Sequence, residues 1–378
     1  SAPLAVGGVA FARAQAHRLV GGVVRRRGHN RGSGPRRETL AGDSHEGGQC
    51  TGARATYAGP GVDIIRTPDE RFHRLPGYEF EPHYDELDGL RLHYLDEHET
   101  GRSSDTKRVA PGGSALESSE RPHTNGAAPV VCFHGEPTWA YLYRKMLPPL
   151  VAAGHRVICP DYAGFGRSDK PTERDWYSYD RHSELVSGLL AGLDLSDAVV
   201  VVQDWGGPIG LRWAVENAER VRALVILNTG LFTGRVSKGF LAWRDFAERN
   251  PDLPVGFVIQ GATAGEVPDE VVAAYEAPFP SPESKAGAAQ FPLLVPTDND
   301  QPDAKTMREI ADELSRWEKP ALVAFSDQDP VFPFPKGGER FVELIPTVEE
   351  QVRIEGAAHF LQEDRGELIA EHVLRFLA

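Results

Sequence analysis

Short apolar runs alternate with amphipathic stretches from about residue 91 to the end of the chain. The runs have the length of strands, and the apolar positions between them recur with the spacing of a helix. Strands are predicted at 90–95, 129–133, 156–160, 199–203, 223–228, 321–325 and 351–354, and helices at 179–193 and 207–218, among others. Continuously apolar strands separated by amphipathic helices are typical of an α/β protein with a mostly parallel, doubly wound sheet.

The alternation stops between about residues 232 and 305. This interval is rich in aromatic residues and proline, and it has helical patterns at 238–249 and 269–276. We interpret it as a helical cap inserted between two strands of the sheet. The predicted domains are a core made of 63–231 and 306–378, and a cap over 232–305.

Two segments are too polar to contribute to a core. Residues 1–62 are rich in Gly, Arg and Ala and lack an apolar period, so we expect a disordered N-terminal extension. Three roles stay open for it: an organelle-targeting segment, a nucleic-acid-binding arm, or residues translated from an upstream start site that the folded protein does not need, which we favour. Residues 99–128 are expected to form a long surface loop between strands, because the entropy cost of closing a loop grows slowly with length.

Composition limits the classes of function. The 378 residues carry a net charge of −14, but residues 1–37 hold eight arginines and no acid, so the rest of the chain carries −22. Such an acidic body argues against nucleic acid as a partner. No apolar run approaches the roughly 18 residues that cross a bilayer, so we expect a soluble, cytoplasmic protein. Cys50 lies in a polar segment and Cys132 and Cys159 lie in apolar runs, which favours reduced thiols over disulfides or a zinc site.

The most informative string is VVVVQDWGGP at 199–208, in which a buried strand runs through an aspartate and two glycines into a helix. This is the context of a nucleophile elbow, where a sharp turn lifts one side chain above the sheet at a helix N-terminus. Asp204 stands at the nucleophile position. Gly206 and Gly207 are the small residues that the turn needs on one side, whereas Val202 stands where the serine-type G-x-S-x-G pattern has glycine. Taken alone, Asp204 can also be interpreted as a helix N-cap.

Loops after two other strands bear on the same site. The string FHGEPTW at 133–139 follows a predicted strand, as an oxyanion-hole loop does, and its His134 and Gly135 permit tight backbone geometry. The backbone N–H groups of Glu136 and Trp205 are therefore candidates to hold an oxyanion. The string DYAGFGRSD at 161–169 follows the next strand, and we interpret it as a structural packing turn.

Acidic residues and a histidine follow the last two predicted strands. The string AFSDQDP at 324–330 ends a strand with Asp327 and Asp329, and EGAAHF at 355–360 places His359 in a loop after the final strand. The order nucleophile, acid, histidine is that of the α/β-hydrolase triad. We take His359 as the base and Asp329 as its partner, because Asp329 lies further beyond the strand end. Asp327 is the alternative.

From about residue 64 to its C-terminus the chain resembles the haloalkane dehalogenases, and especially the branch that detoxifies short chlorinated alkanes such as 1,2-dichloroethane. The strings that carry the resemblance span both the core and the predicted cap: IRTPDERF at 65–72, HGEPTW at 134–139, YLYRKM at 141–146, VVQDWGG at 201–207 and APFP at 277–280. Residues 1–60 and 99–128 have no counterpart in it.

The resemblance implies an α/β-hydrolase fold with an inserted helical cap. It also implies a hydrolase that converts a haloalkane to a primary alcohol, halide and a proton through a covalent alkyl-aspartate intermediate. The implied roles are Asp204 as nucleophile, His359 as base, Asp329 as its partner, and the indole N–H groups of Trp205 and Trp243 as halide ligands. In the family's other main branch an asparagine at the position of Glu136 binds halide, so a glutamate here agrees with a ligand from the cap. No metal or other cofactor is implied, and the expected partners are a small apolar halogenated substrate and water, bound by a monomer.

The residue types suit this reaction. A saturated carbon that bears a halogen has no carbonyl group to polarise, so displacement needs a nucleophile that is already ionised, as a carboxylate is. Epoxide hydrolysis is the main alternative, but it needs a pair of cap tyrosines as proton donors, and Tyr275 is the only tyrosine between residues 232 and 305. A non-catalytic ligand-binding protein on the same fold would be expected to lack a triad residue, and all three candidates are present.

Overall fold

The computed structural model describes residues 62–98, 127–234 and 236–378. The predicted N-terminal extension and the predicted polar loop lie outside the described residues, except for Val62, Ala127 and Ala128 at their ends. Among the described residues, no helix combines the length and the apolar character needed to cross a membrane.

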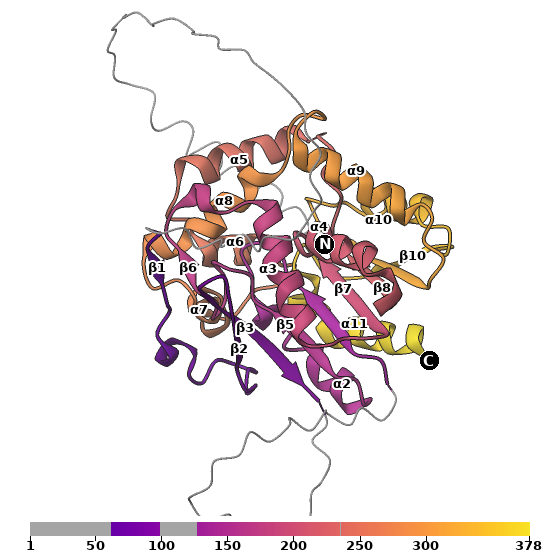
Figure 1. Cartoon of the computed structure of the whole chain (residues 1–378), viewed down its shortest axis with the longest axis horizontal. Helices are drawn as coiled ribbons and strands as arrows, with labels where there is room; N and C mark the ends of the chain where they lie inside the picture. The colour runs from indigo at the N-terminus through magenta and orange to yellow at the C-terminus, as the bar shows by residue number, and fades with distance from the viewer. Residues whose placement is uncertain (1–61, 99–126, 235) are drawn as a thin grey trace, which may run out of the picture. The chain divides into compact units, whose positions relative to one another are not determined.

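An eight-stranded sheet in the order β10-β9-β8-β7-β4-β5-β3-β2 forms the centre of the fold (Figure 1). Its strands are β2 (His83–Leu87), β3 (Leu90–Glu97), β4 (Val130–Phe133), β5 (Val157–Pro160), β7 (Ala198–Gln203), β8 (Val221–Leu227), β9 (Ala321–Ser326) and β10 (Gln351–Ile354). β3 pairs antiparallel with both β2 and β5, and all the other neighbours pair parallel. Two short strands, β1 (Ile64–Ile65) and β6 (Lys170–Pro171), form a separate antiparallel pair. The predicted α/β fold with a mostly parallel sheet is confirmed.

Each predicted strand matches an observed strand, with ends that differ by two residues at most. β2 was not predicted, because its sequence HYDEL has little apolar character and every residue in it is at least partly exposed at the edge of the sheet. Asp88 and Gly89, both with positive φ, form the two-residue turn that joins β2 to β3. An Asp-Gly pair is a strong hairpin signal, and it was available in the sequence.

Helices surround the sheet. They are α2 (Leu147–Ala152), α3 (Tyr179–Gly192), α4 (Gly206–Glu216), α5 (Lys238–Arg249), α6 (Val255–Ala262), α7 (Asp269–Glu276), α8 (Ala286–Leu294), α9 (Pro302–Leu314), α10 (Lys336–Leu344) and α11 (Leu361–Leu377). Short 3-10 helices are η1 (Asp69–Phe72), η2 (Ala140–Tyr143), η3 (Arg174–Trp176), η4 (Ala218–Arg220) and η5 (Pro282–Lys285). α4 packs on β7, α3 and α9, and α11 packs on α2.

Five of these helices, α5 to α9, lie between β8 and β9 in the chain. α5 packs on α8 and α6 packs on α7, whereas α9 packs on α4, which covers the sheet. The predicted boundary at residue 305 therefore falls inside a helix that contacts the core. The assignment of 232–305 as a separate cap domain stays a prediction.

Parallel pairing brings the carboxyl ends of six strands to one edge of the sheet. The register pairs Phe133 of β4 with Val202 of β7, and Ser326 of β9 with Ile354 of β10. The loops that follow these strands therefore meet at the same edge, which is where open α/β sheets bind their ligands. All of the sequence candidates except Trp243 come from these loops or from the first turn of α4.

Candidate active site

Asp204 stands at the sharp turn between β7 and α4. Its φ is 49°, a left-handed conformation that is uncommon for a residue with a side chain and that marks a strained turn. The turn is held from both directions, because the Asp204 N–H donates to the Asn228 carbonyl at 3.0 Å and the Thr229 hydroxyl donates to the Asp204 carbonyl at 2.5 Å. The Asp204 side chain is buried. These contacts hold one carboxylate in place above the end of the central strand.

His359 lies between two carboxylates. Its Nδ1 is 3.0 Å from Asp329 Oδ2, and its Nε2 is 3.6 Å from Asp204 Oδ1. Burial alone lowers the pKa of His359, but the negative charges of Asp329 and Asp204 and their hydrogen bonds outweigh burial and raise this pKa to about 10. The imidazole is therefore positively charged at neutral pH.

The structure brings Asp329 to His359 and keeps Asp327 apart from it. Asp329 is buried, and its other oxygen accepts the Val331 N–H at 2.7 Å. Asp327 instead forms an ion pair with Arg353 at 3.0 Å and accepts the Gly356 N–H. Of the two acids at the end of β9, Asp329 has the geometry of a partner for the histidine.

The loop after β4 touches the Asp204 carboxylate through its backbone. The Glu136 N–H donates to Asp204 Oδ2 at 3.0 Å. This approach requires glycine at the preceding position, since a methyl group on Gly135 would lie 2.4 Å from Asp204 Cβ. The Trp205 N–H, at the start of α4, has no hydrogen-bond acceptor among the described residues. Two backbone donors are thus available near the Asp204 carboxyl group, as an oxyanion hole needs.

Aromatic rings close around Trp205. Phe232 and Phe291 meet its indole edge to face, with ring centroids 5.2 and 5.0 Å away. Trp243 lies on α5, is half-buried and stacks on Phe246 at 5.7 Å. Within the described part of the chain, no ring contact joins Trp243 to Trp205. The structure thus gives Trp205 an apolar surrounding, and it does not bring the two predicted halide ligands into contact.

Polar residues that the sequence analysis did not single out hold the His359 loop. The Asn228 side-chain amide donates to the carbonyls of Ala358 and His359 at 2.9 and 3.2 Å, and the Gln203 amide donates to the same His359 carbonyl at 3.1 Å. Both residues are fully buried at the ends of apolar strands. The sequence did hold a signal for this role: Gln203 and Asn228 each place a side-chain amide at the end of an apolar strand, and a buried amide must find hydrogen-bond partners.

A second set of contacts ties the His359 loop to the helices between β8 and β9. The Phe360 N–H donates to the Ala262 carbonyl at the end of α6, at 3.2 Å. Asp364 accepts the N–H groups of both Ala358 and Ala264, at 2.9 and 3.0 Å. These hydrogen bonds, one between backbone groups and two to the Asp364 side chain, link the position of the histidine loop to the position of α6.

An ion pair anchors the start of α11 a few residues further on. Arg144 donates to both carboxylate oxygens of Glu363 at 2.6 and 2.8 Å, and the Tyr275 hydroxyl of α7 donates to Glu363 at 2.7 Å. Burial favours a raised pKa for Glu363, but the hydrogen bonds and charge of Arg144 outweigh it and lower this pKa to about 2. The Tyr275 hydroxyl is therefore committed to a structural bond.

The turn at 161–169 is also built from structural contacts. Asp161 is buried and bonds to His93 Nδ1 at 2.6 Å and to the Ala140 N–H at 2.8 Å. Among the described residues, no cluster of three or more His, Cys, Asp or Glu side chains is arranged to hold a metal ion.

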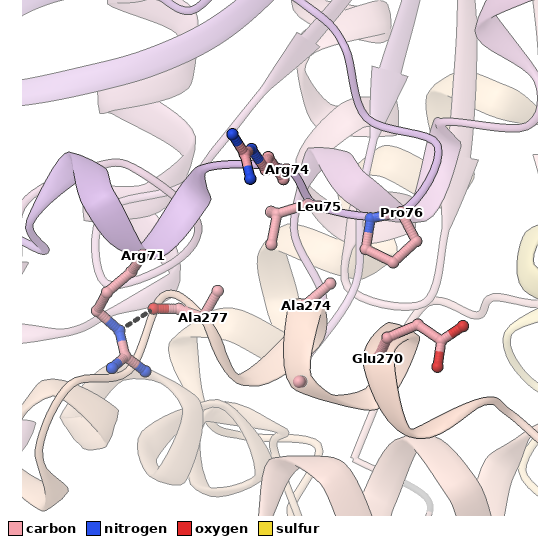
Figure 2. Close-up of a pocket in the computed structure, with 8 residues that line it drawn as sticks. Arg71, Arg74, Leu75, Pro76, Glu270, Ala274 and Ala277 are labelled. Carbon is pink, nitrogen blue, oxygen red and sulfur yellow. Dashed lines mark hydrogen bonds between the residues drawn. The ribbon is translucent and has the colours of Figure 1, made fainter.

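A surface hollow of about 330 Å³ lies elsewhere, between the loop after η1 and helix α7 (Figure 2). Figure 2 shows the Arg71 guanidinium at its rim, where it donates to the Ala277 carbonyl at 2.7 Å. Arg74 and Glu270 are its other charged residues. No predicted site residue lines this hollow, so it is separate from the candidate active site.

Known proteins resemble this chain over most of its length. A family model for the alpha/beta hydrolase fold matches residues 128–366. The haloalkane dehalogenase of Psychrobacter cryohalolentis is 43% identical over 326 residues, which are 84% of this chain and 98% of that protein. Haloalkane dehalogenase 1 of Mycobacterium tuberculosis is 43% identical over 317 residues, 83% of this chain and 98% of that protein.

Solved structures of haloalkane dehalogenases are also similar to this chain. The tetrameric haloalkane dehalogenase DpaA from Paraglaciecola agarilytica has a TM-score of 0.73 at 32% identity, covering 83% of this chain and 98% of that one. The haloalkane dehalogenase DatA from Agrobacterium tumefaciens shares the fold, with a TM-score of 0.64 at 22% identity and coverage of 79% of this chain and 96% of that one.

Replacing Asp329 with Asn should lower the pKa of His359 from its value of about 10, because the amide keeps the shape but removes the adjacent charge. An NMR titration of the imidazole measures this. Asp327→Asn is the matched control, since it removes a nearby charge that pairs with Arg353 instead. If the pKa of His359 falls equally in both variants, or falls only in the control, Asp329 is not the partner of His359.

Proposed function

Because the chain belongs to the haloalkane dehalogenase family, hydrolases that act on carbon–halide bonds, we propose that Asp204 is its nucleophile in a two-step reaction. The observation that carries the proposal is the position of the Asp204 carboxylate, which faces His359 Nε2 and accepts the Glu136 N–H. A nucleophile, a base and an oxyanion donor thus meet at one carboxyl group.

In the first step, an Asp204 oxygen attacks the carbon that bears the halogen. The new C–O bond forms as the carbon–halogen bond breaks, and the bonding pair leaves with the halide. Charge moves from a carboxylate to a halide, so a donor aimed at the halide is stronger in the transition state than in the ground state. We assign this role to the indole N–H groups of Trp205 and Trp243. Phe232 and Phe291 keep water away from Trp205, which strengthens such a bond.

Formation of the ester prepares His359 for the second step. In the free protein the charges of Asp329 and Asp204 keep the pKa of His359 raised to about 10, so this residue is an acid at neutral pH. Alkylation removes the charge of Asp204, and the pKa of His359 falls. His359 then loses a proton to solvent and becomes a base. Alkylation of Asp204 in the first step therefore makes His359 a base for the second step.

Hydrolysis of the ester restores the carboxylate. Water attacks the carboxyl carbon of Asp204 while His359 takes one of its protons, and the N–H groups of Glu136 and Trp205 hold the oxyanion. Collapse breaks the bond to the alkoxy oxygen, which leaves as the alcohol with the remaining proton of the attacking water. Asp204 is again ionised and His359 is again protonated. The net products are an alcohol, a halide ion and one proton.

Epoxide hydrolysis has no support in the site. It requires tyrosine hydroxyls that protonate the opening ring, and the one tyrosine between residues 232 and 305 bonds to Glu363. The aromatic surrounding of Trp205 supports short, apolar haloalkanes as substrates. We further propose that the protein detoxifies such compounds in the cytoplasm as a monomer, although the related DpaA forms a tetramer.

His359→Gln should trap the intermediate, because alkylation needs no base whereas hydrolysis does. With 1-bromobutane, intact-mass spectrometry should show one added butyl group on the peptide that contains Asp204. Asp204→Asn is the control, since it keeps the shape of the site but removes the nucleophilic charge. It should give neither adduct nor turnover unless the amide is hydrolysed back to aspartate. Turnover by the Asp204→Asn variant without conversion of the amide back to aspartate would show that Asp204 is not the nucleophile.

Trp243→Phe tests the second halide ligand. It keeps an aromatic ring but deletes one donor, which typically costs on the order of 3 kcal/mol of transition-state stabilisation, or about a hundredfold in rate. Halide affinity, measured from tryptophan fluorescence with bromide, should fall as well. Trp317→Phe is a matched control, because Trp317 is buried between α9 and β9 and is not among the predicted site residues. If the Trp243→Phe variant keeps wild-type turnover and halide affinity, Trp243 is not the second halide ligand and another residue must bind the halide.

A further inference from the structure

The side chain of Glu136 has no role in the mechanism described so far, which uses only its backbone N–H. It is 8% exposed, and its Oε1 is buried with no hydrogen-bond partner among the described residues. Its backbone bond to Asp204 Oδ2 places the start of the side chain beside the nucleophile. A buried carboxyl group without a partner is costly to a folded protein and calls for an explanation.

Of the two charged groups that face Glu136, Asp204 opposes its ionisation and His359 favours it more weakly. Asp204 is the nearest carboxylate, and the other charged group that faces it, His359, is shared between Asp204 and Asp329. His134, two residues earlier, is neutral because burial lowers its pKa. No lysine or arginine in the described residues pairs with Glu136. Burial, followed by the charge of Asp204, therefore raises the pKa of Glu136 well above its ordinary value.

We propose that Glu136 is a positioning residue that works as a neutral carboxylic acid beside Asp204. In this form it fills the space next to the nucleophile, excludes water from it and leaves Asp204 as the sole anion at the reacting carbon. An ionised Glu136 would place a second negative charge beside the site where the halide leaves. This role rests on the proposed function of Asp204 and refines the first step of that reaction.

A purely structural role predicts a different set of effects. If Glu136 only filled space, its protonation state would have no consequence for alkylation, and an amide or an apolar residue would serve equally well. If Glu136 acted as an anion, the neutral amide would fail. A neutral acid predicts that glutamine, which has its shape and an N–H donor, replaces it and that alanine does not.

The experiment measures protonation and alkylation separately. Infrared difference spectra between the wild-type protein and Glu136→Gln at neutral pH report the C=O stretch of an un-ionised carboxyl group. We expect this band in the wild-type protein. Carboxylate bands in its place would overturn the proposal. This readout needs no substrate, so it does not depend on the function of Asp204.

Alkylation is measured in the His359→Gln background, which removes the titration of the histidine and stops the reaction after the first step. Adduct formation with 1-bromobutane should be slowed on the order of tenfold by Glu136→Ala, because water then reaches the nucleophile, and largely restored by Glu136→Gln. Thermal unfolding confirms that each variant is folded. An amide variant as slow as the alanine variant, or an alanine variant as fast as the parent, would overturn the proposal.

Failure of the proposed function gives a different result. If Asp204 is not the nucleophile, the His359→Gln parent forms no adduct at all, whatever residue stands at position 136. If only the role of Glu136 is wrong, the parent forms its adduct at a normal rate and the variants fail to follow the predicted order.

Discussion

The candidate active site depends on one imidazolium held between two carboxylates. Asp329 and Asp204 lie on either side of the His359 ring, and together they overcome the effect of burial on its pKa. The arrangement balances charge in a buried site, and it also accounts for the order of the two steps in the proposed reaction. As long as Asp204 is ionised, His359 keeps its proton. In the proposed reaction, esterification of Asp204 removes the charge that holds this proton, so His359 becomes a base only when there is an ester to hydrolyse.

The fold maintains this arrangement through contacts between strand ends. Asn228 is central, because its carbonyl accepts the Asp204 N–H while its side-chain amide donates to the His359 carbonyl. One residue at the end of β8 is therefore hydrogen-bonded both to Asp204, the proposed nucleophile, and to His359, the proposed base. The strained backbone of Asp204 persists because both of its neighbours in space, Asn228 and Thr229, bond to it. Through Ala262 and Asp364, the histidine loop is also hydrogen-bonded to the end of helix α6 and to Ala264 just after it.

Much of this could be predicted from the sequence, because strand-sized apolar runs and the order of Asp204, Asp329 and His359 are local patterns. What escaped prediction depends on contacts between distant segments. Val202 departs from the serine-type pattern, and the structure shows why it is tolerated: Gly210 on α4 faces it, and a methyl group there would lie 2.6 Å from Val202 Cγ1. The raised pKa of Glu136 likewise depends on burial in the folded protein and then on the charge of Asp204, 68 residues away. The binding of halide by Trp205 and Trp243 together stays a prediction, and so does the role of the segments outside the described residues.

The covalent intermediate is the central claim, and isotope labelling tests it most directly. A single turnover in water enriched in ¹⁸O, with enzyme in excess over 1-bromobutane, follows the oxygen atom of the product alcohol. Because the alkyl group first bonds to an Asp204 oxygen and water later attacks the carboxyl carbon, the two-step scheme predicts unlabelled alcohol and one ¹⁸O atom in the Asp204 carboxylate. Alcohol that carries ¹⁸O from its first turnover, with an unlabelled Asp204, would show that water displaces the halide directly and would contradict the scheme.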